Sequence, residues 1–243
     1  MATFVLVHGS TAGGWCWAKV TPILRAAGHE VYTPTLTGLG ERAHLLTPNV
    51  SLSTHIDDIV NVLFYEDLHD VVLVGWSYGG MVISGVAEQA ANRLAKLVYL
   101  DAFMPNDGES AFDLVPHIRD RWLSEAINVN GVHARAPYSR EFMMNTWHIL
   151  DSSDLTWMAE RVTPMPLATH QDPIQLPSNR AADIPRSFIF CARGTLVPLA
   201  DRAQHLGADY YELQSHHAPM ATMPQELASL LTQLADGSAT PGR

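Results

Sequence analysis

The chain has 243 residues, of which 47% are hydrophobic and 16% are charged, and this suits one compact α/β domain with room for an inserted subdomain. Its formal net charge is −10, from 15 basic and 25 acidic residues, so we expect no nucleic-acid or anionic-membrane partner. No apolar run reaches the length of a membrane span, and residues 4–7 are too few for the core of a secretory signal, so we expect a cytoplasmic protein. Cys16 and Cys191 lack metal-ligand or redox spacing and are expected to be buried free thiols.

Short apolar runs that alternate with helical patterns predict a parallel sheet whose strands are buried on both faces. We expect strands at residues 4–7, 29–33, 71–74, 94–100, 187–192 and 208–213. We expect helices at about 15–27, from Ser53 as N-cap to 66, from about 78, at 199–206 and at 224–235. This order requires right-handed crossovers, which gives an α/β fold with a mostly parallel sheet of about six strands flanked by helices.

The alternation stops between residues 105 and 183, where no clear strand is visible and tryptophan, methionine and proline are frequent. We interpret this stretch as a helical cap over the carboxyl ends of the strands, where open α/β sheets bind ligands. An ordinary helical excursion on the sheet edge is the alternative. The expected division is a core of 1–104 and 184–236, a cap of 105–183 and a flexible tail of 237–243.

The sequence Gly75-Trp76-Ser77-Tyr78-Gly79 follows a predicted strand and precedes a predicted helix. This is the context of a nucleophile elbow, in which glycines on both sides of a strained serine let neighbouring backbones approach. A tight strand-to-helix turn without chemistry would have the same pattern. The apolar strand before it and the helix after it favour Ser77 as a catalytic nucleophile.

A serine hydroxyl needs a base, and His217 is the best placed of the twelve histidines because it follows the last predicted strand. His216 is its neighbour and rival. The remaining candidates are expected to have structural roles (His8 and His29) or to line a pocket or lie in solvent (His148 and His170).

Backbone amides can stabilise the oxyanion that forms when a carbonyl is attacked. The two amides expected at this position are those of Ser10, in the loop after the first strand, and Tyr78, the residue after the nucleophile. No phosphate loop, dinucleotide motif or metal-ligand spacing is visible, so we expect neither a cofactor nor a metal.

Motifs spread over the whole predicted sheet give the chain a family resemblance. Besides the elbow and His217 to Pro224, these motifs are Val5-Leu6-Val7-His8-Gly9-Ser10, Gly13-Gly14-Trp15-Cys16-Trp17, Gly38-Leu39-Gly40-Glu41-Arg42 and Leu97-Val98-Tyr99-Leu100-Asp101-Ala102. The chain resembles α/β-hydrolases of the small plant methyl esterase and hydroxynitrile lyase group, and most of all their bacterial esterase members. The resemblance implies a lidded pocket, a Ser-His-Asp triad and small, often aromatic, ester substrates. A lyase of this group would carry lysine after the histidine, where this chain has Ala218.

One departure from the family concerns the triad acid, which the family places just beyond the strand at 187–192. The aligned position is Gly194, and His216 replaces the aspartate that usually precedes the histidine. Asp101 ends the strand after the elbow helix and is our first candidate for the acid. Its alternative role is to hold a loop amide, and Asp201 is a weaker candidate.

Together these features predict a serine hydrolase that cleaves a small hydrophobic or aromatic ester through an acyl-enzyme, with a non-standard acid. The missing aspartate leaves open a cyclase or C–C lyase, or a ligand-binding protein without activity. The expected pocket residues are Trp122, Trp147, Met220 and His216. The sequence leaves a homodimer open.

Overall fold

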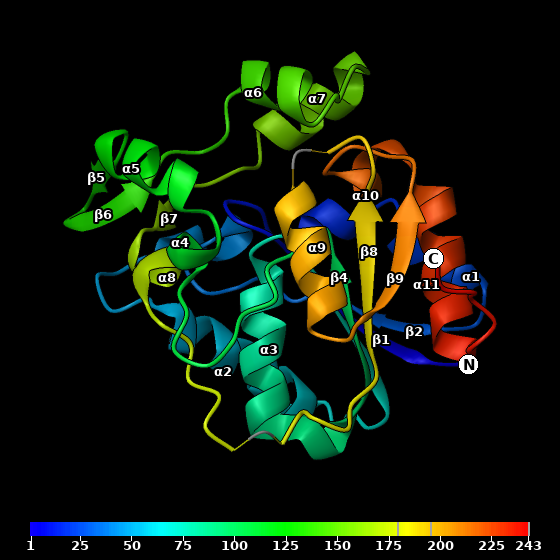
Figure 1. Ribbon diagram of the computed structural model, residues 1–243. Coiled ribbons are helices and arrows are strands. Elements are labelled where there is room, and N and C mark those ends of the chain that lie inside the picture. Colours follow the sequence, from blue (N-terminus) through cyan, green and yellow to red (C-terminus); the bar gives the residue numbers. More distant parts are fainter. Residues whose placement is uncertain (179, 195, 243) are drawn as a thin grey trace.

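A six-stranded sheet forms the centre of the computed structural model, which describes residues 1–178, 180–194 and 196–242 (Figure 1). The strands, in their spatial order, are β2 (Glu30–Tyr32), β1 (Thr3–Val7), β3 (Val71–Trp76), β4 (Leu94–Leu100), β8 (Arg186–Cys191) and β9 (Asp209–Leu213). All of these strands pair in parallel within the described residues. The predicted parallel sheet of about six strands is confirmed.

Helices cover both faces of the sheet because its strands are apolar on both sides; all six residues of β3 are buried. One face is covered by α2 (Leu52–Tyr65), α3 (Gly79–Ala90) and α9 (Val197–His205), through side chains such as Ile59, Ile83 and Leu199. The other face is covered by α1 (Thr21–Ala26) and α11 (Pro224–Asp236), through Leu24 and Leu231. The two faces therefore have separate apolar cores.

The first helix differs from the prediction, which placed one helix over about 15–27. The chain instead forms a 3₁₀ turn, η1 (Gly14–Trp17), and only then α1. Pro22 lies in the first turn of α1, where its missing N–H leaves no hydrogen bond unmade. Gly28 follows this helix with a φ of +86°, as its predicted role as a stop requires.

The predicted N-cap of the second helix is wrong by two residues. Ser51 caps α2, since its hydroxyl accepts from the Thr54 amide and the Thr54 side chain accepts from the Ser51 amide. Ser53 lies within the helix, where its hydroxyl contacts that of Ser51 at 2.9 Å. Either serine satisfies the simple capping rule, and the reciprocal bond to Thr54 decides between them.

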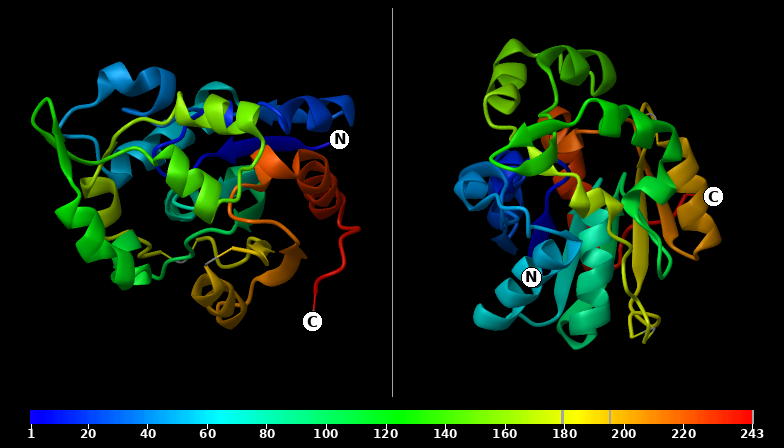
Figure 2. Two further views of the ribbon diagram at one scale, coloured as in Figure 1. Left: turned by 90° about the horizontal axis from the view of Figure 1, so that it is seen from above. Right: turned by 90° about the vertical axis from the view of Figure 1, so that its left-hand side faces the viewer.

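The chain leaves the sheet after β4 and returns at β8 (Figure 2). We call the intervening residues 105–183 the insert. Its elements are α4 (Ala111–Leu114), α5 (Pro116–Ser124), β5 (Ile127–Val129), β6 (Val132–Arg135), α6 (Arg140–Thr146), α7 (Ser152–Ala159), β7 (Met165–Pro166) and α8 (Ala168–Gln171). The expectation of a purely helical stretch is wrong, because β5, β6 and β7 form an antiparallel sheet. In Figure 1, α5, β5, β6, α6 and α7 of the insert lie at the end of the molecule to which the strand arrows point, and the chain after α8 runs back to the opposite end, where β8 begins.

Residues in the later part of the insert make hydrogen bonds to the loop after β1. The amide of Thr163 donates to the carbonyl of Thr11 at 2.9 Å, and the amide of Thr11 contacts the Met165 sulfur at 3.4 Å. The amide of Gly40 donates to the Thr163 hydroxyl at 3.0 Å. Thr163 and Met165 belong to a segment that continues through β7 to the end of α8. We call this segment, residues 163–171, the returning limb.

Three remaining short elements, η2 (Gly40–Leu45), η3 (Ala91–Arg93) and α10 (Pro219–Thr222), connect the larger ones. Cys16 and Cys191 are buried and unbonded, as predicted. Among the described residues no helix combines the length and the apolar character needed to cross a membrane. In the predicted tail, the amide of Gly242 donates to the Tyr210 carbonyl at 2.8 Å, while residue 243 lies outside the described residues.

Replacing the N-cap residue, Ser51→Ala, should lower the free energy of unfolding by about 1 kcal/mol, because the Thr54 amide loses its side-chain partner. For a chain of this size that corresponds to a fall in Tm of about 2–4 °C. Ser53→Ala is the matched control, with a much smaller effect expected. Thermal unfolding of the three proteins tests this, and equal losses for the two variants would contradict the assignment of Ser51.

Candidate active site

Ser77 lies in the turn between β3 and α3 with a φ of 55°, in the left-handed region that serine rarely adopts. Its carbonyl accepts from the amides of Gly80 at 3.0 Å and Phe103 at 3.1 Å, and its amide donates to the Leu100 carbonyl at 3.2 Å. These three hydrogen bonds hold the strained turn. The side chain is 8% exposed and lines a cavity.

Glycines let the backbones around this turn touch. A Cβ on Gly75 would lie 2.6 Å from the Gly79 carbonyl oxygen, and one on Gly79 would lie 2.8 Å from the Val7 carbonyl oxygen. These contacts agree with the predicted need for glycine on both sides of Ser77. Gly80 has the tightest contact, since its Cβ would lie 2.0 Å from the Phe103 carbonyl oxygen.

The sheet order brings the loops after β1 and β3 together. In the sheet, β2 lies on one side of β1 and β3 lies on the other, so the direction in which strands are added reverses at β1. The ends of β1 and β3 lie next to each other at this point. A Cβ on Gly9 would lie 3.0 Å from the Cβ of Ser77, which measures this close approach. Ser10 and Tyr78 are buried beside Ser77, and within the described residues their amides have no hydrogen-bond partner.

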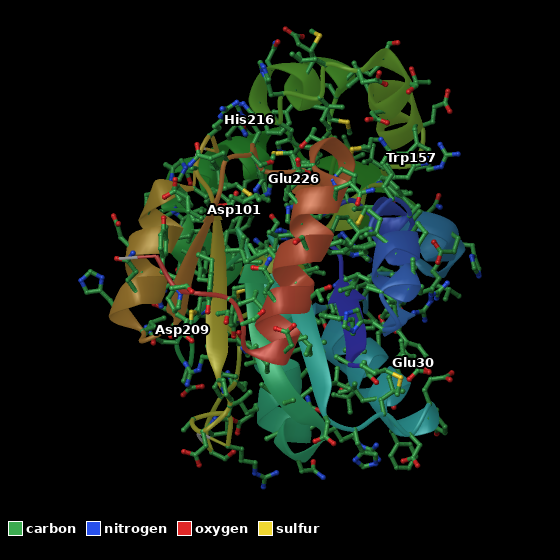
Figure 3. The ribbon with its side chains drawn as sticks, turned by 90° about the vertical axis from the view of Figure 1, so that its right-hand side faces the viewer. Glu30, Asp101, Trp157, Asp209, His216 and Glu226 are labelled. Atoms are coloured by element: carbon green, nitrogen blue, oxygen red, sulfur yellow. The ribbon has the colours of Figure 1, made fainter. Side chains whose placement is uncertain are left out.

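His217 and Asp101 form a buried hydrogen bond. The Nδ1–H of His217 donates to Asp101 Oδ2 at 2.6 Å, and Asp101 is fully buried. Because Nδ1 carries the proton of this hydrogen bond, Nε2 of the neutral ring keeps its lone pair. Asp101 follows β4 and His217 follows β9, and Figure 3 shows Asp101 at the end of the sheet nearest the insert.

The backbone and two aromatic rings hold this pair in place. The amide of Cys191 contacts Asp101 Oδ1 at 3.4 Å, and the indole N–H of Trp76 donates to the His217 carbonyl at 2.7 Å. The imidazole centroid lies 5.4 Å from Trp76 and 5.8 Å from Trp147. Apolar rings thus cover part of the imidazole and limit its rotation.

Gly194 lies beside the same carboxylate. A Cβ at this position would be 3.3 Å from Asp101 Oδ2. A side chain at residue 194, the family position of the triad acid, would therefore begin next to the carboxylate of Asp101. Asp201, the weaker sequence candidate, is exposed on α9.

A buried imidazole of the insert, His170, connects Ser10 and Tyr78. Its Nε2 lies 2.9 Å from the Ser10 hydroxyl, and its ring stacks on that of Tyr78 with centroids 4.8 Å apart. The Thr169 hydroxyl donates to the Pro166 carbonyl at 2.6 Å and lies 3.0 Å from His170 Nδ1. Because the Thr169 hydroxyl proton is already donated to Pro166, His170 Nδ1 carries a proton and donates it to the Thr169 oxygen. Nε2 of His170 then accepts a hydrogen bond from the Ser10 hydroxyl.

Burial keeps this network uncharged. Burial lowers the pKa of His170 to about 3, and the nearby Arg135 charge adds to the effect. Burial also lowers the pKa of His55 to about 4. Nε2–H of His55 donates to the Thr37 carbonyl at 3.0 Å, so its Nδ1 accepts from the Tyr78 hydroxyl, also at 3.0 Å. The side chains of Ser10 and Tyr78 are both held by neutral histidines.

The cavity beside Ser77 has a volume of about 250 Å³. Ser10, Ser77 and His217 line its floor, and the insert supplies aromatic side chains that include Trp122, Tyr138, Phe142 and Trp147. Of the predicted pocket residues, Trp122 and Trp147 are at this cavity. Met220 is buried in the core beneath α11, and His216 stacks on His148 at 4.5 Å, so neither is among the described lining residues.

Two other predicted histidines are structural, as expected. His8 accepts from the Leu36 amide at 3.0 Å, and burial lowers its pKa to about 4. His29 accepts from the Ala2 amide at 3.2 Å. The expectation for His170 is wrong, because it is fully buried in the network above instead of lining a pocket or facing solvent.

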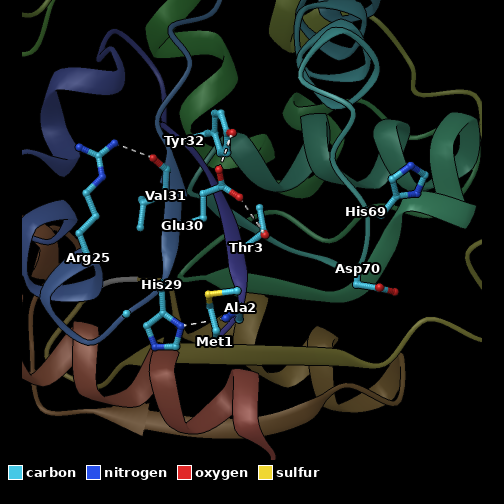
Figure 4. A pocket seen from close by; sticks show the side chains of 11 residues that line it. Met1, Ala2, Thr3, Arg25, His29, Glu30, Val31, Tyr32, His69 and Asp70 are labelled. Carbon is cyan, nitrogen blue, oxygen red and sulfur yellow. Dashed lines mark hydrogen bonds between the residues drawn. The ribbon is translucent and has the colours of Figure 1, made fainter.

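A larger hollow of about 840 Å³ lies away from Ser77, near the starts of β1 and β2 (Figure 4). Its polar side chains mostly satisfy one another or the backbone. Glu30 accepts from Tyr32 at 2.9 Å, and Arg25 donates to the Val31 carbonyl at 2.8 Å. Ser77, His217 and Ser10, the predicted site residues, lie instead at the smaller cavity. No cluster of metal-ligating side chains occurs in the described part of the chain.

The sequence reasoning missed the roles of His170 and Arg135, which lies 8% exposed between two aromatic rings. Neither residue belongs to a local motif, because its partners are far away in the chain; Ser10 and His170 are 160 positions apart. The hairpin that carries Arg135 did have a signal, the Asn130-Gly131 pair, which favours a two-residue turn.

The chain belongs to the alpha/beta hydrolase family, whose model matches residues 4–230. It is 40% identical to the carbendazim hydrolyzing esterase of Nocardioides sp. (strain SG-4G), over 96% of this chain and 100% of that one. It is 29% identical to methylesterase 7 of Arabidopsis thaliana, over 96% of each chain. An extracellular alpha/beta-hydrolase from a Paenibacillus species superposes with a TM-score of 0.79 at 26% identity, over 97% of this chain and 99% of that one.

These findings confirm the fold and the family resemblance expected from the motifs. Because the relatives in sequence are named esterases, the protein is an esterase-like α/β-hydrolase.

The buried histidines predict how stability depends on pH. The pKa values of His8 and His55 are about 4 when folded and 6.5 in a model peptide, so the unfolded chain binds more protons between these values. The free energy of unfolding should therefore fall as pH drops from 6.5 towards 4, by up to about 1.4 kcal/mol per pH unit for each histidine.

Urea unfolding at pH 5, 6 and 7 measures this slope. His55→Gln should make it shallower, and His205→Gln, at an exposed position on α9, should leave it unchanged. An identical slope in the His55 variant and the parent protein would contradict the assignment.

Proposed function

We propose that the protein is a serine hydrolase that cleaves a small hydrophobic or aromatic carboxylic ester through an acyl-enzyme on Ser77. The observation that carries the proposal is the 2.6 Å hydrogen bond between His217 Nδ1 and the buried Asp101, at the cavity that Ser77 and His217 line. It supplies the carboxylate that the sequence lacks at position 194. The relatives named for carbendazim hydrolysis and for methyl esters support a small ester substrate.

In the first half of the reaction, Ser77 Oγ attacks the ester carbonyl while His217 Nε2 takes the hydroxyl proton. Asp101 keeps Nδ1 protonated and stabilises the imidazolium that forms. The carbonyl oxygen becomes an oxyanion, which accepts hydrogen bonds from the amides of Ser10 and Tyr78. When the tetrahedral intermediate collapses, the ester C–O bond breaks and His217 returns its proton to the leaving alcohol.

In the second half, water attacks the acyl group on Ser77 and His217 takes the water proton. The bond between Ser77 Oγ and the acyl carbon then breaks, the proton returns to Ser77, and the carboxylic acid leaves. The role of His170 is to hold the residues that carry the oxyanion amides, through its contacts with the Ser10 hydroxyl and the Tyr78 ring. The insert acts as the cap of the cavity.

The sequence left open a cyclase, a C–C lyase or an inactive binding protein because the family position of the triad acid holds Gly194. The contact between Asp101 and His217 weakens that reason, because it supports Asp101 as the acid. The unpartnered amides of Ser10 and Tyr78 also favour a reaction in which a carbonyl oxygen becomes negative. A serine hydrolase is therefore the function that this site supports best.

Ser77→Ala should reduce hydrolysis of p-nitrophenyl acetate to the uncatalysed rate and abolish labelling by a fluorophosphonate probe, because both require the hydroxyl. Ser229→Ala removes an exposed hydroxyl on α11 and should change neither measurement. Intact-mass spectrometry of the labelled proteins locates the adduct. Turnover that survives in Ser77→Ala would refute the proposal.

Asp101→Asn should lower kcat by about 10³- to 10⁴-fold, because the amide cannot hold the imidazole in the required protonation state. Adding Gly194→Asp should restore at least about tenfold of this loss, since a Cβ at residue 194 begins 3.3 Å from Asp101 Oδ2. Asp201→Asn is the control and should keep full activity. Parent-like kcat in Asp101→Asn would exclude Asp101 as the acid.

A further inference from the structure

Arg135, at the end of β6, is a buried cation that the proposed reaction does not use. It is 8% exposed. Its guanidinium carbon lies 4.2 Å from the ring centroid of Trp122 and 3.6 Å from that of Tyr138. Such contacts occupy the faces of the guanidinium and leave the N–H groups at its edge as donors.

The donors of Arg135 are incompletely used. Nη1 donates to the Ala136 carbonyl at 2.9 Å, while the buried Nε has no partner within the described residues. Among those residues no carboxylate forms an ion pair with this guanidinium, although ion pairs occur elsewhere, such as that of Arg42 with Asp58 at 3.0 Å. A buried charge that no carboxylate contacts is costly, and this cost favours a partner that binds from outside.

A second cavity, of about 240 Å³, reaches Arg135. Four of its lining residues also line the cavity beside Ser77: Arg121, Trp122, Tyr138 and Phe142. The two cavities are therefore neighbours that share a wall of the insert. A ligand that occupies both cavities, with its ester at Ser77, would have to extend past these side chains towards Arg135.

The charge of this region is opposite in sign to that of the whole chain. The chain has a formal net charge of −10. The second cavity is lined by Arg121 and Arg135 against one carboxylate, Glu125, and the described lining of the Ser77 cavity includes Arg121 and no acidic residue. A cationic wall in an acidic protein attracts an anionic ligand to this place.

We propose that the cavity at Arg135 binds a free carboxylate of the substrate, so that the protein prefers esters that carry a second, ionised carboxyl group. The half-ester of a dicarboxylic acid is the simplest member of this class. This inference rests on the proposed ester hydrolysis for its substrate class. The planar guanidinium edge, held by Trp122 and Tyr138, matches a carboxylate in shape and charge.

The kinetic test compares two esters of similar size, mono-p-nitrophenyl glutarate and p-nitrophenyl valerate. The parent protein should have the higher kcat/KM for the glutarate ester. Arg135→Gln should lower kcat/KM for this ester by about 10- to 100-fold, the range expected when a charged hydrogen bond is lost, and should leave the valerate ester nearly unchanged. Arg119→Gln, at an exposed position on α5, is the control and should change neither value.

The proposed preference is contradicted if the parent protein has the same kcat/KM for the two esters, or if Arg135→Gln lowers kcat/KM for both esters by the same factor. Arg135→Lys keeps the charge between the two rings and covers the case in which Arg135→Gln does not fold. It should retain the fold and lose most of the preference, because lysine lacks the planar fork.

A binding measurement separates this proposal from the proposed hydrolysis. Titration calorimetry of Ser77→Ala with monomethyl glutarate should show binding that weakens about 10- to 100-fold when Arg135→Gln is added, whether or not the parent protein hydrolyses esters. Equal binding by the two proteins, or none by Ser77→Ala, would overturn the carboxylate site. Loss of ester turnover and of Ser77 labelling, with this binding intact, would overturn the hydrolase alone.

Discussion

At Ser77 the backbones of neighbouring segments approach so closely that a methyl group does not fit between them. The loop after β1 touches the serine through Gly9, α3 meets the end of β1 at Gly79, and the chain after β4 presses on Gly80. Three hydrogen bonds then hold the serine in a left-handed conformation. The cost of that conformation, of order 1–3 kcal/mol, is met by this packing. The site is rigid because it is built from backbone.

The same convergence brings two positions of the chain to one place beside His217. Asp101 begins directly after β4, and the loop that contains Gly194 follows β8, the neighbouring strand. Both loops open at one edge of the sheet, and a side chain from either reaches the same side of His217. Under the proposed mechanism His217 needs a carboxylate at one point in space, and the loops after two neighbouring strands both come close to that point.

Most of the core could be predicted from sequence because its signals are local. Buried strands are apolar runs, and the strand at Leu94–Leu100 agrees with its predicted bounds. The glycine pattern around Ser77 likewise locates the turn. The missed sheet of the insert depends in part on contacts between distant residues: β6 gains its partner β7 from about thirty positions later, and a strand of two residues has no pattern of its own.

The candidate site also combines residues with local sequence signals and residues whose contacts are distant in the chain. Motif and chain order predict Ser77 and His217 as site residues, whereas Asp101 was one candidate of two in the sequence and lies beside His217 in the fold. His170 and Arg135 carry no local signature, because a lone histidine or arginine in a helical or hairpin segment is ordinarily exposed to solvent. Only the folding of the insert against Ser10 and Tyr78, and around Arg135, buries them.

The hairpin of β5 and β6 gives the insert a point at which its length is free to vary. Asn130 and Gly131 form an exposed turn, whereas the pairing of β6 with β7 and the bonds of the returning limb to Thr11 lie at the other end. Residues added at this turn leave those contacts in place. Evolution can therefore lengthen the hairpin, and an experimenter can attach a fluorophore or an affinity tag there, without disturbing the serine turn beneath.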